Sequence, residues 1–248
     1  MNQMRNWWVS WILPTELNLE SLQLSCLTSE LLSKERARSL YRAESRDIID
    51  EADLRREQTV LETTMCALVP ALPALTALLS HPPQRAPLKT SSGILDPPLG
   101  RMRLALTELF SALLSTKWEP LKQALVEAET ASILLDLFFK YSQNNILHGY
   151  VESCIHNIVF WGEENPALAH LVSSGRIFDR LLAAWYPPSP VRPVDYSGHV
   201  TKMTNDLVFA MGENQSYSCS TLLRSFSKLP MKTQEKWKEL VEGNLKKV

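Results

Sequence analysis

The chain has 248 residues, of which 45% are hydrophobic and 21% are charged, and these proportions suit a globular protein with a substantial apolar core. It carries 26 basic and 27 acidic residues, so its formal net charge is -1. Because clustered basic side chains drive binding to nucleic acids and to acidic membrane surfaces, this balance argues against both. Only eight glycines occur, which disfavours folds built from strands and turns and leaves no glycine-rich phosphate loop.

The N-terminal segment combines a tryptophan-rich start with one predicted helix. Trp7, Trp8 and Trp11 fall within five residues. They fit packing against the first helix, a membrane anchor or an atypical chain start, and we predict neither a signal peptide nor stable membrane insertion. The spacing of leucines then predicts a helix from Glu16 to about Tyr41.

Prolines divide the next part of the chain. The apolar pattern predicts a helix that ends at Leu68, because Pro70 and Pro73 lack the amide donor that a continuing helix needs. A short helix is expected directly afterwards. The segment 81–100 holds five prolines, so we predict a loop there, of the kind that often binds partners or marks a boundary.

Beyond Gly100 the apolar spacing predicts one helix after another, with a second proline-rich loop near 187–195. Pro120 is tolerated in the first turn of its helix, Thr130 is a predicted N-cap, and either Asn144 or Asn145 is expected to cap the helix that follows. The predicted helices begin near residues 101, 117, 130, 146, 166, 177, 197, 218 and 231.

These helices fall into groups of three, each opened by a long helix. The long helices begin about 45 and about 51 residues apart, close to the period of armadillo and HEAT repeats. We therefore predict an all-α fold, an armadillo/HEAT-like helical repeat solenoid in which each unit is buried against its neighbours. An irregular helical bundle is the alternative.

One set of side chains merits testing as a chemical site. His148, Glu152 and His156 recur every four residues and are expected on one polar side of a helix. Imidazoles and carboxylates ligate metals, but the first and last lie about 12 Å apart along a helix axis, so they do not share one ion. Contact with solvent or with a partner is favoured over a metal-dependent hydrolase. No standard catalytic motif is present, and no cofactor is expected.

Two further polar features have structural interpretations. Asp136 lies in a strongly apolar run, so we expect it to form a salt bridge or cap a neighbouring helix. Cys154 and His156 fall on different sides of their helix and do not form a nucleophile pair. The four widely spaced cysteines are expected to be reduced, which favours a cytoplasmic location that extends to the nucleus.

Two blocks of sequence resemble a known family. One is Gly93-Ile94-Leu95-Asp96-Pro97-Pro98-Leu99-Gly100 followed by Arg103-Leu104, and the other runs from Leu134-Leu135-Asp136 through Asn144-Asn145 and Leu147-His148 to Val151-Glu152 and Cys154-Ile155. Shorter matches are Arg180-x-Leu182-x-Ala184-Trp185, Gly198-His199-Val200-Thr201-Lys202, and Leu229-Pro230 with Trp237. Together they resemble the SAPS-domain family, the regulatory subunits of protein phosphatase 6.

The resemblance implies a non-catalytic scaffold that binds a Ser/Thr protein phosphatase catalytic subunit and directs its substrate choice or location. Ankyrin-repeat regulatory subunits are implied as further partners, and a helical scaffold for another protein is the alternative. Residues 58–248 look like the C-terminal half of the family's domain, preceded by a divergent segment, 1–57. The partner-binding residues implied by the motifs are Asp96, Pro97, Pro98, Gly100, Arg103, Asn144, Asn145, His148, Glu152, Gly198 and His199.

Overall fold

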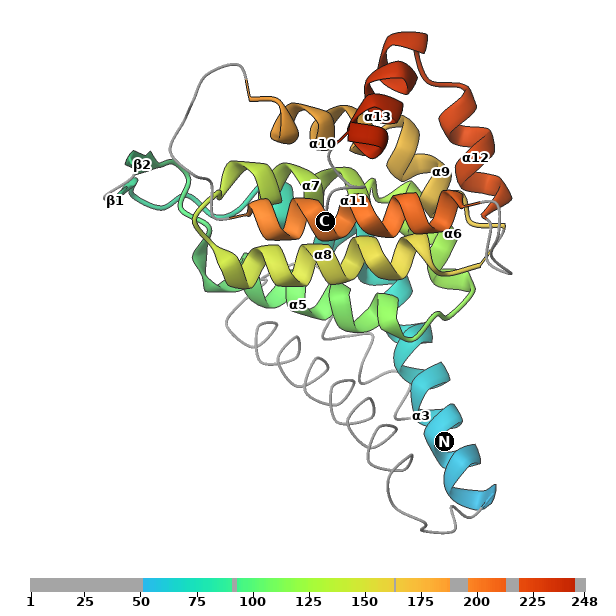
Figure 1. Ribbon diagram of the computed structural model, residues 1–248. Coiled ribbons are helices and arrows are strands. Elements are labelled where there is room, and N and C mark those ends of the chain that lie inside the picture. The colour runs from blue at the N-terminus through green and yellow to red at the C-terminus, as the bar shows by residue number, and fades with distance from the viewer. Residues whose placement is uncertain (1–50, 91–92, 163, 188–195, 213–218, 244–248) are drawn as a thin grey trace, which may run out of the picture.

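The computed structural model describes residues 51–90, 93–162, 164–187, 196–212 and 219–243 (Figure 1). The tryptophan-rich start, the helix predicted from Glu16 to Tyr41 and most of the second proline-rich loop lie outside these residues. Within them the chain is mostly helical, as predicted. The helices are α3 (Glu51–Leu68), the short 3₁₀ helix η1 (Val69–Ala71), α4 (Leu72–Ser80), α5 (Gly100–Ser115), α6 (Pro120–Glu127), α7 (Thr130–Lys140), α8 (Asn145–Val159), α9 (Pro166–Ser173), α10 (Ile177–Trp185), α11 (Ser197–Met211), α12 (Ser220–Ser227) and α13 (Met231–Gly243).

The segment predicted as a plain loop, 81–100, contains a small β-hairpin. Strand β1 (Leu88–Thr90) pairs antiparallel with β2 (Gly93–Leu95), and Leu88 lies opposite Leu95. The prediction of a loop was therefore wrong for these six residues. Two strands of three residues between prolines are too short to give the alternating pattern by which strands are recognised in sequence.

The helix ends follow local chemistry in most places. Pro120 stands in the first turn of α6, and the side chains of Asn144 and Asn165 accept backbone N–H groups at the starts of α8 and α9. The prediction that Thr130 caps α7 was wrong. Glu129 occupies the N-cap with a positive φ of 51°, and the buried Thr130 hydroxyl instead lies 3.2 Å from the Thr76 hydroxyl of α4.

The long helices α5, α8 and α11 pack side by side and begin at the end of the molecule that carries the hairpin (Figure 1). The short helices α6, α9 and α12 form a second row of contacts, while α4 packs on α5, α6 and α7, and α13 packs on α10. A continuous apolar core runs through these contacts from Met65 to Leu240. Helix α7 is internal, as its sequence predicted, with Leu135 and Phe138 fully buried.

One segment, Gln58–Ser80, is long and apolar enough to cross a membrane by length and composition, with a mean hydropathy of 1.6. Core helices pass the same test. This segment is broken by η1 at Pro70, and Leu72 and Leu79 in its second half belong to the core. We therefore assign it to the packed helical body, and the absence of stable membrane insertion stays a prediction.

Candidate functional site

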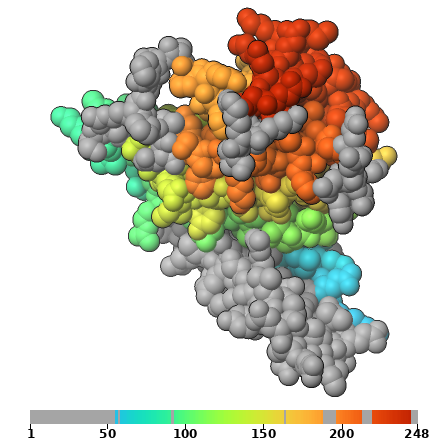
Figure 2. All heavy atoms as spheres, viewed as in Figure 1, coloured from blue at the N-terminus to red at the C-terminus, as the bar shows by residue number. Residues whose placement is uncertain are grey.

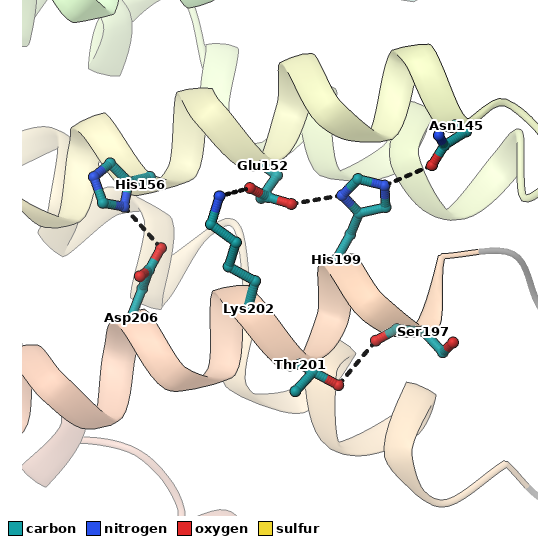
Figure 3. Close-up of polar contacts among 8 residues, drawn as sticks. All are labelled: Asn145, Glu152, His156, Ser197, His199, Thr201, Lys202 and Asp206. Carbon is teal, nitrogen blue, oxygen red and sulfur yellow. Dashed lines mark hydrogen bonds and ion pairs between the residues drawn. The ribbon is translucent and has the colours of Figure 1, made fainter.

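Most residues implied by the family motifs fall into two clusters, both of which include residues at the start of α8. One lies between α8 and α11 and is called here the polar seam: Asn145, Glu152 and His156 of α8 face His199, Lys202 and Asp206 of α11 (Figure 3). The other surrounds the hairpin and the first turn of α5. The two differ in how their polar groups are used.

Glu152 is the centre of the polar seam. Its side chain is only 10% exposed, and its two carboxylate oxygens accept hydrogen bonds from Nδ1 of His199, at 2.5 Å, and from Nζ of Lys202 (Figure 3). Nε2 of His199 lies 2.8 Å from Oδ1 of Asn145. One turn further along, Nδ1 of His156 lies 2.9 Å from a carboxylate oxygen of Asp206. The seam thus joins α8 to α11 by charge-assisted contacts.

The placement of His148 corrects the expected polar face. His148 is fully buried and Glu152 nearly so, whereas only His156 remains substantially exposed. The prediction that the three share a solvent-facing side was wrong for the first two, because α11 and the residue before it cover that side. Nε2 of His148 donates to the carbonyl oxygen of Phe138 at 3.2 Å, and its ring packs against Phe138 and Tyr196.

The electrostatics of the seam favour pairing over chemistry. The hydrogen bond to the Glu152 carboxylate raises the pKa of Lys202, with the negative charges of Glu152 and Asp206 adding to it against the opposing effect of burial. Burial also raises the pKa of the Cys154 thiol, which keeps it protonated and a poor nucleophile. Cys154, Cys66 and Cys219 are free thiols. Among the described residues, no three histidine, cysteine, aspartate or glutamate side chains gather as a metal site would require.

Arg103 is buried beneath the second cluster and joins several of its backbone segments by hydrogen bonds. It is 2% exposed, and its guanidinium lies 5.1 Å from the centre of the Tyr141 ring and donates to the Tyr141 hydroxyl at 2.6 Å. That hydroxyl in turn donates to the carbonyl oxygen of Pro97. The remaining guanidinium bonds reach the carbonyl oxygens of Leu79, Pro98 and Leu99. A side chain so fully engaged has no free surface for a partner. Its role is to hold the segment Asp96–Leu99, called here the proline turn, against α4 and the end of α7.

The other motif residues of this cluster are more accessible. Asp96 is exposed, and Pro97, Pro98 and Gly100 are partly buried. Gly100 has a φ of +74°, a conformation that favours glycine, so the backbone rather than a side chain explains this residue. Gly198 is exposed in the first turn of α11, beside the half-buried His199. Asn144 serves as the N-cap of α8, and Asn145 is exposed and reaches His199.

An open groove of about 510 Å³ lies next to this turn, and most of its residues were not singled out from sequence. Its walls come from the hairpin, from the first turns of α5 and from the start of α8. The lining residues are Arg85, Ala86, Leu88, Leu95, Pro98, Leu99, Gly100, Arg101, Leu104 and Asn144. Pro98, Gly100 and Asn144 connect it to the motif residues.

Several residues of both clusters escaped the sequence-based selection. Lys202 and Tyr141 were part of the motif blocks but were not proposed as site residues, although a lysine three residues after His199, on the same side of a helix, was a usable signal. Asp206 and the groove residue Arg85 carried no signal of their own. The salt bridge predicted for Asp136 is confirmed, because it pairs with Arg180 at 2.6 Å.

Comparison with known proteins places both clusters in one family. The family model described as "SIT4 phosphatase-associated protein", or SAPS, matches residues 24–124 and 118–248. Its first match thus begins within the segment that the motifs left as divergent. No solved structure matches the chain.

Curated relatives agree with this match. The chain is 33% identical over 210 residues to serine/threonine-protein phosphatase 6 regulatory subunit 3-B of Xenopus laevis. The aligned region is 75% of the chain and 24% of that relative. The chain is 31% identical to regulatory subunit 1 and 27% identical to regulatory subunit 2 of Homo sapiens, over 76% and 77% of the chain and 24% of each relative. The chain therefore spans about a quarter of the length of these relatives, and it belongs to the SAPS family of phosphatase-associated proteins.

Proposed function

We propose that the chain is a non-catalytic regulatory scaffold that binds a Ser/Thr protein phosphatase catalytic subunit of the phosphatase 6 type and directs its substrate choice or location. The observation that carries the proposal is the match of the SAPS family model to nearly the whole chain. The names of the relatives, phosphatase 6 regulatory subunits, support the same role. Ankyrin-repeat regulatory subunits as further partners, and a cytoplasmic location that extends to the nucleus, belong to the same proposal.

We further propose that the helices form an armadillo/HEAT-like repeat solenoid. The contacts support it, because α5, α8 and α11 stack as one row and α6, α9 and α12 as another. The three long helices begin at Gly100, Asn145 and Ser197, close to the spacing expected of such repeats. Stacked repeats expose a long rigid surface, which suits a scaffold. In this proposal residues 58–248 form the C-terminal half of the family's domain.

Co-precipitation tests the regulatory role. The tagged 248-residue chain is mixed with purified phosphatase 6 catalytic subunit, and a matched bait carries the same tag on an unrelated helical-repeat protein. Specific retention of the catalytic subunit is the expected result. Retention equal to that of the matched bait contradicts the proposal for this chain.

A second measurement separates a scaffold from an enzyme. The repurified chain alone should not hydrolyse a phosphopeptide or a generic ester. Turnover that is absent from His148→Ala, and that the wild-type protein loses to a chelator and regains with a divalent metal, would overturn the non-catalytic assignment and favour the hydrolase.

A further inference from the structure

The groove beside the hairpin combines exposed apolar side chains with two exposed arginines. Its volume, about 510 Å³, lies in the range of about 300–1,000 Å³ that ligand sites occupy. Such a space accommodates a few side chains of a short segment but not a folded domain. The hairpin that forms one wall projects from the body of the molecule (Figures 1 and 2).

Apolar side chains line much of this groove. Leu88 is 52% exposed, and the partly buried Leu95 and Leu104 stand with it in the lining. Leu88 and Leu95 lie opposite each other in the hairpin, so their side chains share one face of it. Exposed apolar side chains that gather at one place mark an interaction site, whereas scattered ones need no explanation.

The charged side chains that line the groove, Arg85 and Arg101, are both basic. Arg85 and Arg101 are exposed lining residues, and neither has a side-chain hydrogen bond or ion pair with any described residue. Elsewhere Arg180 pairs with Asp136, so arginines of this fold do find carboxylates where they are available. The first turn of α5 contains no acidic residue. Among the residues that the structure describes, these two guanidinium groups therefore have no partner beside an apolar wall.

We propose that this groove docks a short linear segment of a protein partner in which an aliphatic or aromatic side chain is flanked by carboxylates. The leucines bury the apolar side chain, and Arg85 and Arg101 bind the carboxylates, for which the planar guanidinium is well matched. The inference goes beyond the proposed regulatory role, because it assigns a surface and a ligand chemistry that do not depend on which protein carries the segment.

Selection from a library of random dodecapeptides displayed on phage tests this chemistry, with the 248-residue chain immobilised. The expected result is enrichment of peptides with one apolar residue between acidic ones. A fluorescein-labelled synthetic copy of the most enriched peptide then gives the affinity by fluorescence anisotropy. Enrichment without acidic residues, or no enrichment above the bare support, overturns the proposal.

Charge-reversal variants locate the binding. Arg85→Glu with Arg101→Glu should weaken peptide binding by about tenfold or more, the loss expected when a charge-assisted hydrogen bond is removed. The milder Arg85→Gln with Arg101→Gln serves if the first variant folds poorly. Arg224→Glu, at an exposed arginine of α12 outside the groove, is the matched control and should bind as the wild type does. Equal affinity in the groove variants and the control contradicts the assignment.

The apolar half of the proposal has its own control. Leu88→Asp should weaken binding, whereas Leu223→Asp on α12, also an exposed leucine, should not. If Leu88→Asp has no effect and inorganic phosphate competes with the peptide, the groove is a general anion site and the proposal fails. Co-precipitation of the phosphatase is measured separately on the same variants, so that failure of the groove proposal and failure of the regulatory role remain distinguishable.

Discussion

The polar seam and the groove beside the hairpin both begin at the start of α8, but their charged side chains have opposite surroundings. In the seam, Glu152 is buried and satisfied by His199 and Lys202 from the facing helix. In the groove, Arg85 and Arg101 are exposed and have no such partner among the described residues. The seam stabilises the fold, whereas the arginines of the groove are accessible to another molecule.

The comparison also separates two meanings of a family motif. Residues such as Arg103 and His148 belong to the motif blocks and yet are buried, where each bonds backbone carbonyl oxygens of neighbouring segments. Their identity is explained by the fold. Motif membership therefore does not by itself mark a residue as part of a binding surface.

The largest expected effect concerns helix α7, which packs beneath α8. Phe138→Ala should lower the free energy of unfolding by about 3–5 kcal/mol, since it empties a fully buried site beneath His148 and Tyr196. Leu135→Ala, in the same helix, should cost about 2–5 kcal/mol. Urea denaturation followed by circular dichroism measures both. Unchanged transition midpoints would mean that α7 is not internal.

The next effect concerns the seam itself. Glu152→Ala should lower the free energy of unfolding by about 1.5–3 kcal/mol, the range for hydrogen bonds to a charged group. The change leaves His199 and Lys202 without their shared acceptor. Glu239→Ala, at an exposed glutamate of α13, is the control and should change little. A loss no larger than the control's would place Glu152 on a free surface, as the sequence first suggested.

Much of the fold follows from local pattern. The helix starts predicted near residues 166 and 197 coincide with the observed starts of α9 at Pro166 and α11 at Ser197. At α9, Asn165 and Pro166 both favour a helix start. The internal position of α7 was also predictable, because a helix that is apolar on most sides needs neighbours on most sides.

What escaped prediction depends on contacts between distant segments. Helical spacing shows that His148 and Glu152 share a side, but it does not show that α11, about 50 residues later, covers that side. The groove has the same origin. Arg85 and Arg101 are separated by the hairpin, and no local pattern brings them together.

A smaller effect tests the exposed part of the seam. Lys202→Met should lower the free energy of unfolding by only about 0.5–1 kcal/mol at neutral pH. The effect is small because the Lys202 side chain is largely exposed, and exposed ion pairs contribute little to stability. Its pKa is raised above the ordinary lysine value of 10.5 in the folded protein, so its contribution is complete below that value and is lost as the pH rises through the folded pKa. The stability difference between wild type and variant should therefore shrink above pH 10.5. Lys232→Met, an exposed lysine of α13, is the control.

The smallest expected effect is the one that sets the groove apart from the seam. Arg85→Glu with Arg101→Glu should change the free energy of unfolding by no more than about 0.5 kcal/mol, because neither arginine has a described partner to lose. Arg103→Gln, only two residues from Arg101, should destabilise the protein clearly, since it removes the bonds to Tyr141 and to the proline turn. Thermal and urea denaturation of both variants measure the contrast. Equal destabilisation would show that the groove arginines also hold the fold together, and the distinction between a closed seam and an open groove would then be lost.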